Sequence, residues 1–203
     1  MSFFRRVPSL VLALLLAASC SPGISMAQTS DPRLARYAGD YKYVGGDEDI
    51  AALDRAIDEV VDQMNFFIRG IARRRLRAPN LPSKTVAIIM ENEQIRIERP
   101  GQPTVSAPAD GSSITWRHPT DGDVFQVRHG IDDEGALYQR FEGEQSISRN
   151  RFVLSQDEKR LTIHTTITAD RLPAPLRFKM SYERQPRSMH TSHTHGDQVG
   201  ELA

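Results

Sequence analysis

The feature that most constrains this chain is an alternation of apolar and polar residues that runs from residue 84 to residue 184. It is clearest in residues 161–167 and 176–182, which are separated by a segment with two prolines. In an extended strand this pattern places the apolar side chains on one face, and a Pro-containing segment reverses the chain. The sequence therefore predicts an antiparallel hairpin with one buried and one solvated face.

Similar segments recur upstream, with Pro-Gly or Asp-Gly turns between them, at a spacing of about ten residues. The segment 86–90 is almost continuously apolar, as a strand buried on both faces would be. The chain is therefore predicted to be mainly β, an antiparallel meander that closes as a barrel or folds as a sandwich. The expected strands are 37–44, 86–90, 95–98, 104–107, 114–116, 124–127, 137–141, 147–154, 161–167 and 176–182.

One helical segment, at about residues 48–77, interrupts this pattern after the first strand. Asp47 is a suitable N-cap, the arginines of 73–77 suit the C-terminal end of the helix dipole, and Pro79 ends the helix. Gly70 is expected to divide the segment into a longer and a shorter helix. Its apolar residues recur every three or four positions and predict one buried stripe: Ile50, Leu53, Ile57, Val60, Val61, Met64, Phe67, Ile68 and Ile71.

The N-terminal residues resemble an export signal. Two arginines precede the apolar run 11–18, which is short for a bilayer span but typical of a secretory signal peptide. Residues 25–27 form a small-x-small cleavage site, which predicts a signal peptide at 1–27. Alternatively, residues 16–20 resemble a lipoprotein box, in which Cys20 would be lipidated. Both predict a bacterial protein outside the cytoplasm, either periplasmic or secreted, or an outer-membrane lipoprotein.

Composition sets further bounds. Residues 28–186 are predicted to form one globular domain, followed by a polar tail at 187–203 that holds His190, His193 and His195. The formal net charge is zero, which argues against nucleic acid as a partner. Because Cys20 is the only cysteine, the mature domain can hold neither an intramolecular disulfide nor a cysteine-based zinc site.

The order of elements resembles a known family. A strand containing Gly39 and Tyr41, then a helical segment, then a long meander ending at 180–184, is similar to the fatty-acid-binding proteins and, more broadly, the calycin barrels that include lipocalins. The resemblance implies a barrel with a helical lid and a lipid-like small molecule as partner. In the fatty-acid-binding proteins an Arg-x-Tyr pair on the last strand holds the carboxylate. Here Met180 precedes Tyr182 at that spacing, so this site is not implied.

The inward face of such a barrel is the candidate ligand site. Aromatic and apolar residues of the strands and the lid would line it, and Arg140, Arg149 and Arg151 are candidates to bind an anionic head group, unless they form a solvated outer face. A filled interior is the alternative, and it would leave an envelope protein with a structural or interaction role. The candidate ligand-binding residues are Tyr41, Met64, Phe67, Trp116, Tyr138, Arg140, Phe178, Met180 and Tyr182.

Other functions receive less support. No nucleophile elbow, metalloprotease motif or phosphate-binding loop is present, so the sequence offers no positive sign of an enzyme, catalytic residues or a cofactor. His118, His129 and His164 lack metal-ligand spacing, so no metal is expected. The acidic start of the helix disfavours contact with anionic lipid, so membrane attachment is expected only through Cys20. The oligomeric state is left open.

Overall fold

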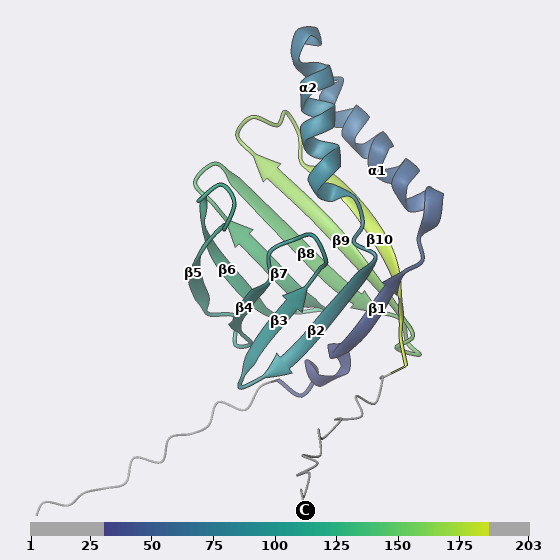
Figure 1. Cartoon of the computed structure of the whole chain (residues 1–203), viewed down its shortest axis with the longest axis vertical. Helices are drawn as coiled ribbons and strands as arrows, with labels where there is room; N and C mark the ends of the chain where they lie inside the picture. The colour runs from purple at the N-terminus through teal and green to yellow at the C-terminus, as the bar shows by residue number, and fades with distance from the viewer. Residues whose placement is uncertain (1–30, 187–203) are drawn as a thin grey trace, which may run out of the picture.

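The structure, a computed structural model, describes residues 31–186 (Figure 1). The predicted signal peptide, Cys20 and the tail histidines lie outside these residues. The elements are the 3₁₀ helices η1 (Ala35–Tyr37) and η2 (Ala78–Asn80), the helices α1 (Gly46–Val61) and α2 (Phe66–Arg77), and the strands β1 (Gly39–Tyr43), β2 (Thr85–Glu91), β3 (Gln94–Glu98), β4 (Val105–Pro108), β5 (Ser113–Arg117), β6 (Val124–Ile131), β7 (Leu137–Glu142), β8 (Ser146–Leu154), β9 (Arg160–Ala169) and β10 (Leu176–Arg184).

The ten strands form one antiparallel sheet that curls into a barrel (Figure 1). The spatial order is β4-β3-β2-β1-β10-β9-β8-β7-β6-β5, so strands that follow one another in sequence pair with each other, except β4 with β5, and the first strand also pairs with the last. Tyr41 lies opposite Arg184 and Tyr43 opposite Tyr182. This order, with two helices after the first strand, confirms the predicted lipocalin-like or fatty-acid-binding-like barrel.

The barrel wall is incomplete between its two end strands. Within residues 31–186 no backbone pairing joins β4 to β5, although the two strands are consecutive in the chain. A small apolar cluster fills the junction, with Val105 and Ala107 of β4 packed with Val127 of β6. We call this junction, formed by β4 on one side and by β5 and β6 on the other, the seam. Side-chain packing, not a hydrogen-bond ladder, therefore closes the wall here.

Strand β2 differs from its predicted environment. Val86 and Ile88 are buried, but Ala87 and Ile89 between them are only half-buried. The expectation of a strand buried on both faces is therefore wrong. The outer face of β2 is apolar without being covered.

The helical segment divides at residues 62–65, and not at Gly70 as expected. The break has a local cause, because the side chain of Asn65 caps α2 by accepting a hydrogen bond of 3.0 Å from the Phe67 amide. The predicted apolar stripe is buried in α1, through Leu53, Ile57, Val60 and Val61. In α2 no residue is buried.

Two sets of polar contacts fix the helical hairpin. Asp49, in the first turn of α1, is buried and accepts a 2.6 Å hydrogen bond from the Ser181 amide of β10. The two antiparallel helices are then joined by three ion pairs at four-residue steps along each helix, which we call the ion-pair ladder: Asp54 with Arg77, Asp58 with Arg73, and Asp62 with Arg69.

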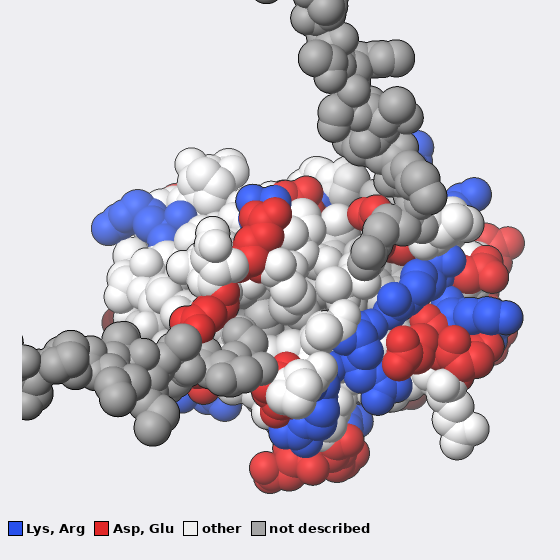
Figure 2. Space-filling model, turned by 90° about the horizontal axis from the view of Figure 1, so that it is seen from below, with Lys and Arg blue, Asp and Glu red and all other residues white. Residues whose placement is uncertain are grey.

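Charged side chains of both signs are interspersed at the end of the molecule opposite the helical hairpin (Figure 2). No helix within residues 31–186 is long and apolar enough to cross a bilayer.

We predict that Asp49→Ala lowers the free energy of unfolding by about 1–3 kcal/mol, because the Ser181 amide would lose its partner in a desolvated place. Urea unfolding followed by circular dichroism measures the change. Asp47→Ala is the matched control, since Asp47 lies in the same turn but is exposed. Equal losses in the two variants would contradict a specific role for the Asp49 contact.

Candidate functional site

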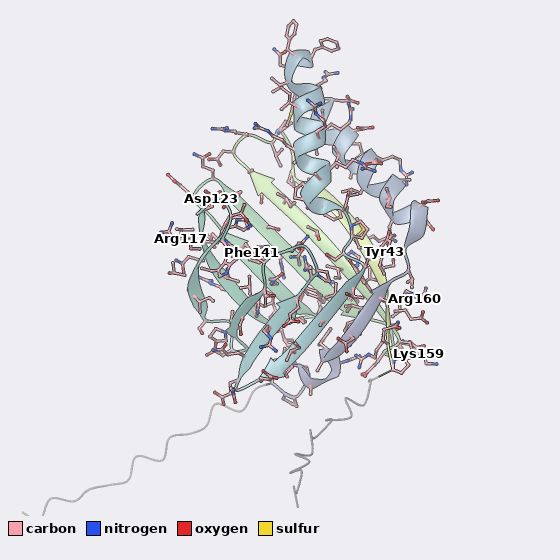
Figure 3. All side chains as sticks on the ribbon, viewed as in Figure 1. Tyr43, Arg117, Asp123, Phe141, Lys159 and Arg160 are labelled. Atoms are coloured by element: carbon pink, nitrogen blue, oxygen red, sulfur yellow. The ribbon has the colours of Figure 1, made fainter. Side chains whose placement is uncertain are left out.

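The barrel is not filled. A cavity of about 730 Å³ lies inside it and opens between the segments 78–83 and 99–103, which connect α2 to β2 and β3 to β4. Its volume falls in the usual range for a small-molecule pocket, roughly 300–1,000 Å³. Figure 3 shows Phe141, one of the lining residues, in the interior, with Arg117 and Asp123 at the outer edge beyond β5 and β6.

Most of the cavity wall is apolar, because strand alternation brings one face of β4 to β10 inward. Trp116 and Phe141 come from one half of the barrel, and Phe178 and Met180 from the other. Trp116, Phe125 and Phe141 contact one another, with ring centroids 5.9–6.2 Å apart. The apolar lining residues on the strands are Val105, Trp116, Phe125, Phe141, Ile163, Ile167, Phe178, Met180 and Tyr182.

One arginine lies in this wall. Arg99 follows β3 and its guanidinium lies 5.8 Å from the centroid of the Phe152 ring. No acidic side chain within residues 31–186 forms an ion pair with Arg99, and its buried Nε has no hydrogen-bond partner there. Desolvation lowers the pKa of Arg99, with a smaller opposing effect from Tyr182. The cavity thus contains an uncompensated positive charge.

Polar side chains continue from Arg99 across the interior as a directed chain of hydrogen bonds. Gln139 Oε1 accepts from Arg99 at 3.4 Å and from Asn150 at 3.1 Å, and Asn150 Oδ1 accepts from the Thr165 hydroxyl at 2.8 Å. The Gln139 amide nitrogen lies 3.0 Å from His129 Nε2. We call these five residues the polar chain. Asn150 and Thr165 also line the cavity, so the chain reaches the space where a ligand would lie.

The hydrogen bonds determine the state of His129. Its Nδ1 lies 2.8 Å from the carbonyl oxygen of Ile95, so Nδ1 carries the proton and donates, and Nε2 accepts from Gln139. A second proton on Nε2 would face the Gln139 amide. Burial lowers the pKa of His129 to about 4, with a further lowering by Arg99 that the Ile95 carbonyl opposes. The imidazole is therefore neutral at pH 7 and connects β6 to β3 across the seam.

Four of the nine predicted site residues line the cavity: Trp116, Phe178, Met180 and Tyr182. They come from β5 and β10, where the alternation is clear. Burial raises the pKa of Tyr182 to about 12, against a lowering by Arg99, so its hydroxyl remains protonated.

Tyr138 and Arg140 do not line the cavity. They alternate with the buried Leu137 and Gln139 on β7 and therefore point outward. Arg140 binds Glu142 at 3.0 Å on the outer surface. Tyr138 instead borders a separate groove near Gly130.

The other two arginines proposed for an anionic head group also face outward. The Arg149 guanidinium lies 5.8 Å from the centroid of the Tyr138 ring. Arg151 binds Asp132 at 2.6 Å and Glu134 at 2.6 Å. Both belong to a solvated outer face, which was the alternative interpretation of these residues.

Three further predicted site residues have other roles. Tyr41 is fully buried in the core, where its hydroxyl donates to the Tyr37 carbonyl and accepts from Arg184, each at 2.7 Å. Met64 is half-buried against the core but does not line the cavity. Phe67 is 87% exposed and does not line the cavity.

The histidines do not converge. His129 is buried, His118 lines the cavity, and His164 is exposed on the outer face of β9. Within residues 31–186 no three potential metal-ligating side chains lie together.

A comparison with solved structures found matches of low sequence identity. Similar structures include a secretary abundant heat soluble (SAHS) protein from Ramazzottius varieornatus, with 12% identity over 74% of this chain and 96% of that chain and a TM-score of 0.44. A mutant of the fluorescent protein UnaG has 12% identity over 75% and 99%, with a TM-score of 0.45, and wild-type UnaG has 10% identity over the same shares, with a TM-score of 0.42. No protein-family model and no curated protein sequence matches the chain.

The sequence interpretation missed the polar part of the site. Ser146, Ser148 and Asn150 share the inward face of β8 with the buried Phe152, and Thr165 shares that of β9 with Ile163. A polar residue at the same alternate positions as buried apolar residues is the signal that could have identified them. No such signal exists for Arg99, which lies just beyond the end of its strand.

We predict that acid weakens the fold through His129. The pKa is about 4 in the folded protein and 6.5 in the unfolded chain, so as pH falls the unfolded chain takes up the proton first. The resulting stability loss begins near pH 6.5, is complete near pH 4, and amounts to roughly 3 kcal/mol.

Urea unfolding at several pH values measures this loss. His129→Gln should remove most of that pH dependence, whatever its effect at pH 7. His164→Gln is the comparison: desolvation also lowers the pKa of His164, but this side chain is exposed, so the variant should lose much less of the pH dependence than His129→Gln. Parallel curves for wild type and His129→Gln would refute the prediction.

Proposed function

We propose that this protein is an exported small-molecule-binding protein that holds one hydrophobic or amphipathic ligand inside its barrel. The observation that carries the proposal is the open cavity of about 730 Å³, with an apolar wall and a few polar groups. Such a combination favours a ligand whose apolar part desolvates the wall and whose polar part is oriented by specific contacts. The export signal supports a site of action outside the cytoplasm.

Arg99 indicates the character of the polar part. A desolvated guanidinium without an acidic partner is costly in the empty protein, so an anionic group placed beside it would gain a charge-assisted hydrogen bond. Arg99, Asn150 and Thr165 all line the cavity and offer polar contacts there. The lining contains no Asp or Glu that would repel an anion. We therefore propose an amphipathic ligand with an anionic head group.

The alternative is an envelope protein with a structural or interaction role and no ligand. It was based on a filled barrel, and the cavity favours the binding protein instead.

Native mass spectrometry of protein purified gently from its own host tests the proposal. We expect an additional mass corresponding to one lipid-like molecule per chain. Repeated preparations without such a mass, combined with no response of the lone tryptophan, Trp116, to any amphiphile, would exclude the proposed function.

We predict that Arg99→Met weakens binding of dodecanoate by about 10- to 150-fold, the equivalent of one hydrogen bond to a charged group. Binding of dodecanol, which has the same chain without the charge, should change little. The emission of Trp116 in the cavity wall reports both titrations.

Arg177→Met is the matched control, since Arg177 lies on β10 but is exposed on the outer face. The empty Arg99→Met protein should also unfold at a higher urea concentration than wild type, because it no longer buries an unpaired charge. If Arg99→Met weakened the binding of dodecanoate and of dodecanol equally, Arg99 would shape the cavity wall and would not bind the head group.

A further inference from the structure

The start of α2 exposes an unusual set of large apolar side chains. Phe66 is 77% exposed, Phe67 87%, Ile68 50% and Ile71 49%. The two phenylalanine rings contact each other edge to face, with centroids 5.9 Å apart, and no other aromatic ring within the described residues contacts either one. We call Phe66, Phe67, Ile68 and Ile71 the apolar tip. Such a contiguous exposed group marks an interaction surface more often than a single exposed residue does.

The position of the tip follows from the ion-pair ladder. Arg69, Arg73 and Arg77 turn one face of α2 toward α1. The half-buried Ala72 and Leu76 pack against the core. The remaining face, with Phe67 and Ile71, is left outward. Figure 1 shows the hairpin rising beyond the ends of the strands, with its turn at the far end, so the tip is convex and projects from the molecule.

The same outward face is cationic one to two turns behind the tip. Residues 67, 71, 74 and 75 lie on one side of the helix by their spacing. Arg74 and Arg75 are exposed, and neither has an ion-pair partner within residues 31–186. Helix α2 contains no acidic residue. The acidic first turn of α1, at residues 47–49, lies at the other end of the hairpin, so the repulsion expected from that turn does not act at the tip. Of the acidic residues nearer the tip, Asp58 and Asp62 are paired with Arg73 and Arg69, which leaves Glu59.

We propose that the apolar tip docks on an anionic membrane surface, with Phe66 and Phe67 entering the boundary between head groups and acyl chains and Arg74 and Arg75 contacting lipid phosphates. With a rise of about 1.5 Å per residue, Arg74 and Arg75 lie roughly 11 Å behind Phe67 along the helix. That separation is similar to the roughly 5–10 Å by which interfacial helices enter a bilayer. Helix α2 leads directly to segment 78–83, so docking brings the cavity mouth toward the lipid.

Other occupants fit less well. A stable protein partner needs roughly 1,000 Å² of interface, which a convex helix end does not offer without a shaped counterpart. A second copy meeting tip to tip would bring the unpaired arginines of both chains together. A lipid surface needs no shaped pocket and supplies the opposite charge.

A local probe in the full chain tests the proposal. Cys20→Ser removes the native thiol, and Gly70→Cys provides a labelling position where an added side chain meets no other atom within 4 Å. With a polarity-sensitive nitrobenzoxadiazole label there, vesicles of equal parts phosphatidylglycerol and phosphatidylcholine should shift the emission to the blue. Vesicles of phosphatidylcholine alone should shift it much less, and added salt should reduce the effect.

Variants separate the two contributions. Arg74→Gln with Arg75→Gln should lower the partition coefficient about fivefold per arginine. Phe66→Ser with Phe67→Ser should lower the partition coefficient more than tenfold. The reason is that each inserted ring contributes a binding free energy similar to that of burying a large apolar side chain. Val124→Ser is the control, because Val124 is 43% exposed on β6, away from the tip.

Three results would overturn the proposal. A label that does not respond to anionic vesicles excludes docking at the tip. An equal loss with Val124→Ser assigns the binding to general apolar surface. A blue shift that grows with protein concentration in the absence of vesicles assigns the tip to contact between copies of the chain.

Discussion

The ladder between the first and the last strand is the interaction on which the rest of the structure depends. Strand β1 pairs with β10 on one side and β2 on the other. Without the pairing of β1 with β10, the sheet would separate into β1 to β4 and β5 to β10, and neither part could enclose a space. The helices are inserted between β1 and β2, so their position depends on the same ladder, which Asp49 reinforces by bonding to β10. Because its partners are far apart in sequence, this contact forms only after a long loop is closed.

The interior combines two opposing demands. A stable core would be apolar, but this barrel holds a chain of buried polar groups from His129 to Thr165. Those groups are nearly all hydrogen-bonded, which offsets the cost of their desolvation and fixes one protonation state. Arg99 at one end is the exception. Sites where a structure departs from local consistency are often the functional ones. Here the departure is the unpaired charge of Arg99 in the cavity wall, which an anionic ligand would neutralise.

The alternation of apolar and polar residues was sufficient to predict the ten strands, because every strand has one face in the interior. It left a barrel and a sandwich open, and the order of the elements, a strand, a helical segment and a meander, favoured the barrel. The alternation failed where both neighbours are apolar or where an inward residue is polar. On β7, Leu137 and Tyr138 are adjacent, and the inward Gln139 hides which of them is buried. The break between the helices could have been found from Asn65, a good N-cap residue. The exposure of α2 could not have been predicted from the sequence, because it depends on which side of α2 the aspartates of α1 bind.

The seam gives this barrel a property that a barrel closed by hydrogen bonds all round lacks. Widening a cylinder breaks ladder hydrogen bonds, whereas widening the slot between β4 and β5 separates mainly apolar side chains and a few side-chain contacts, among them those of His129 with the Ile95 carbonyl and of Arg99 with Gln139. The enclosed volume is therefore adjustable at one place along its circumference. For the proposed ligand, this means that molecules of different width would require movement only at this slot, while the nine strand pairings stay intact.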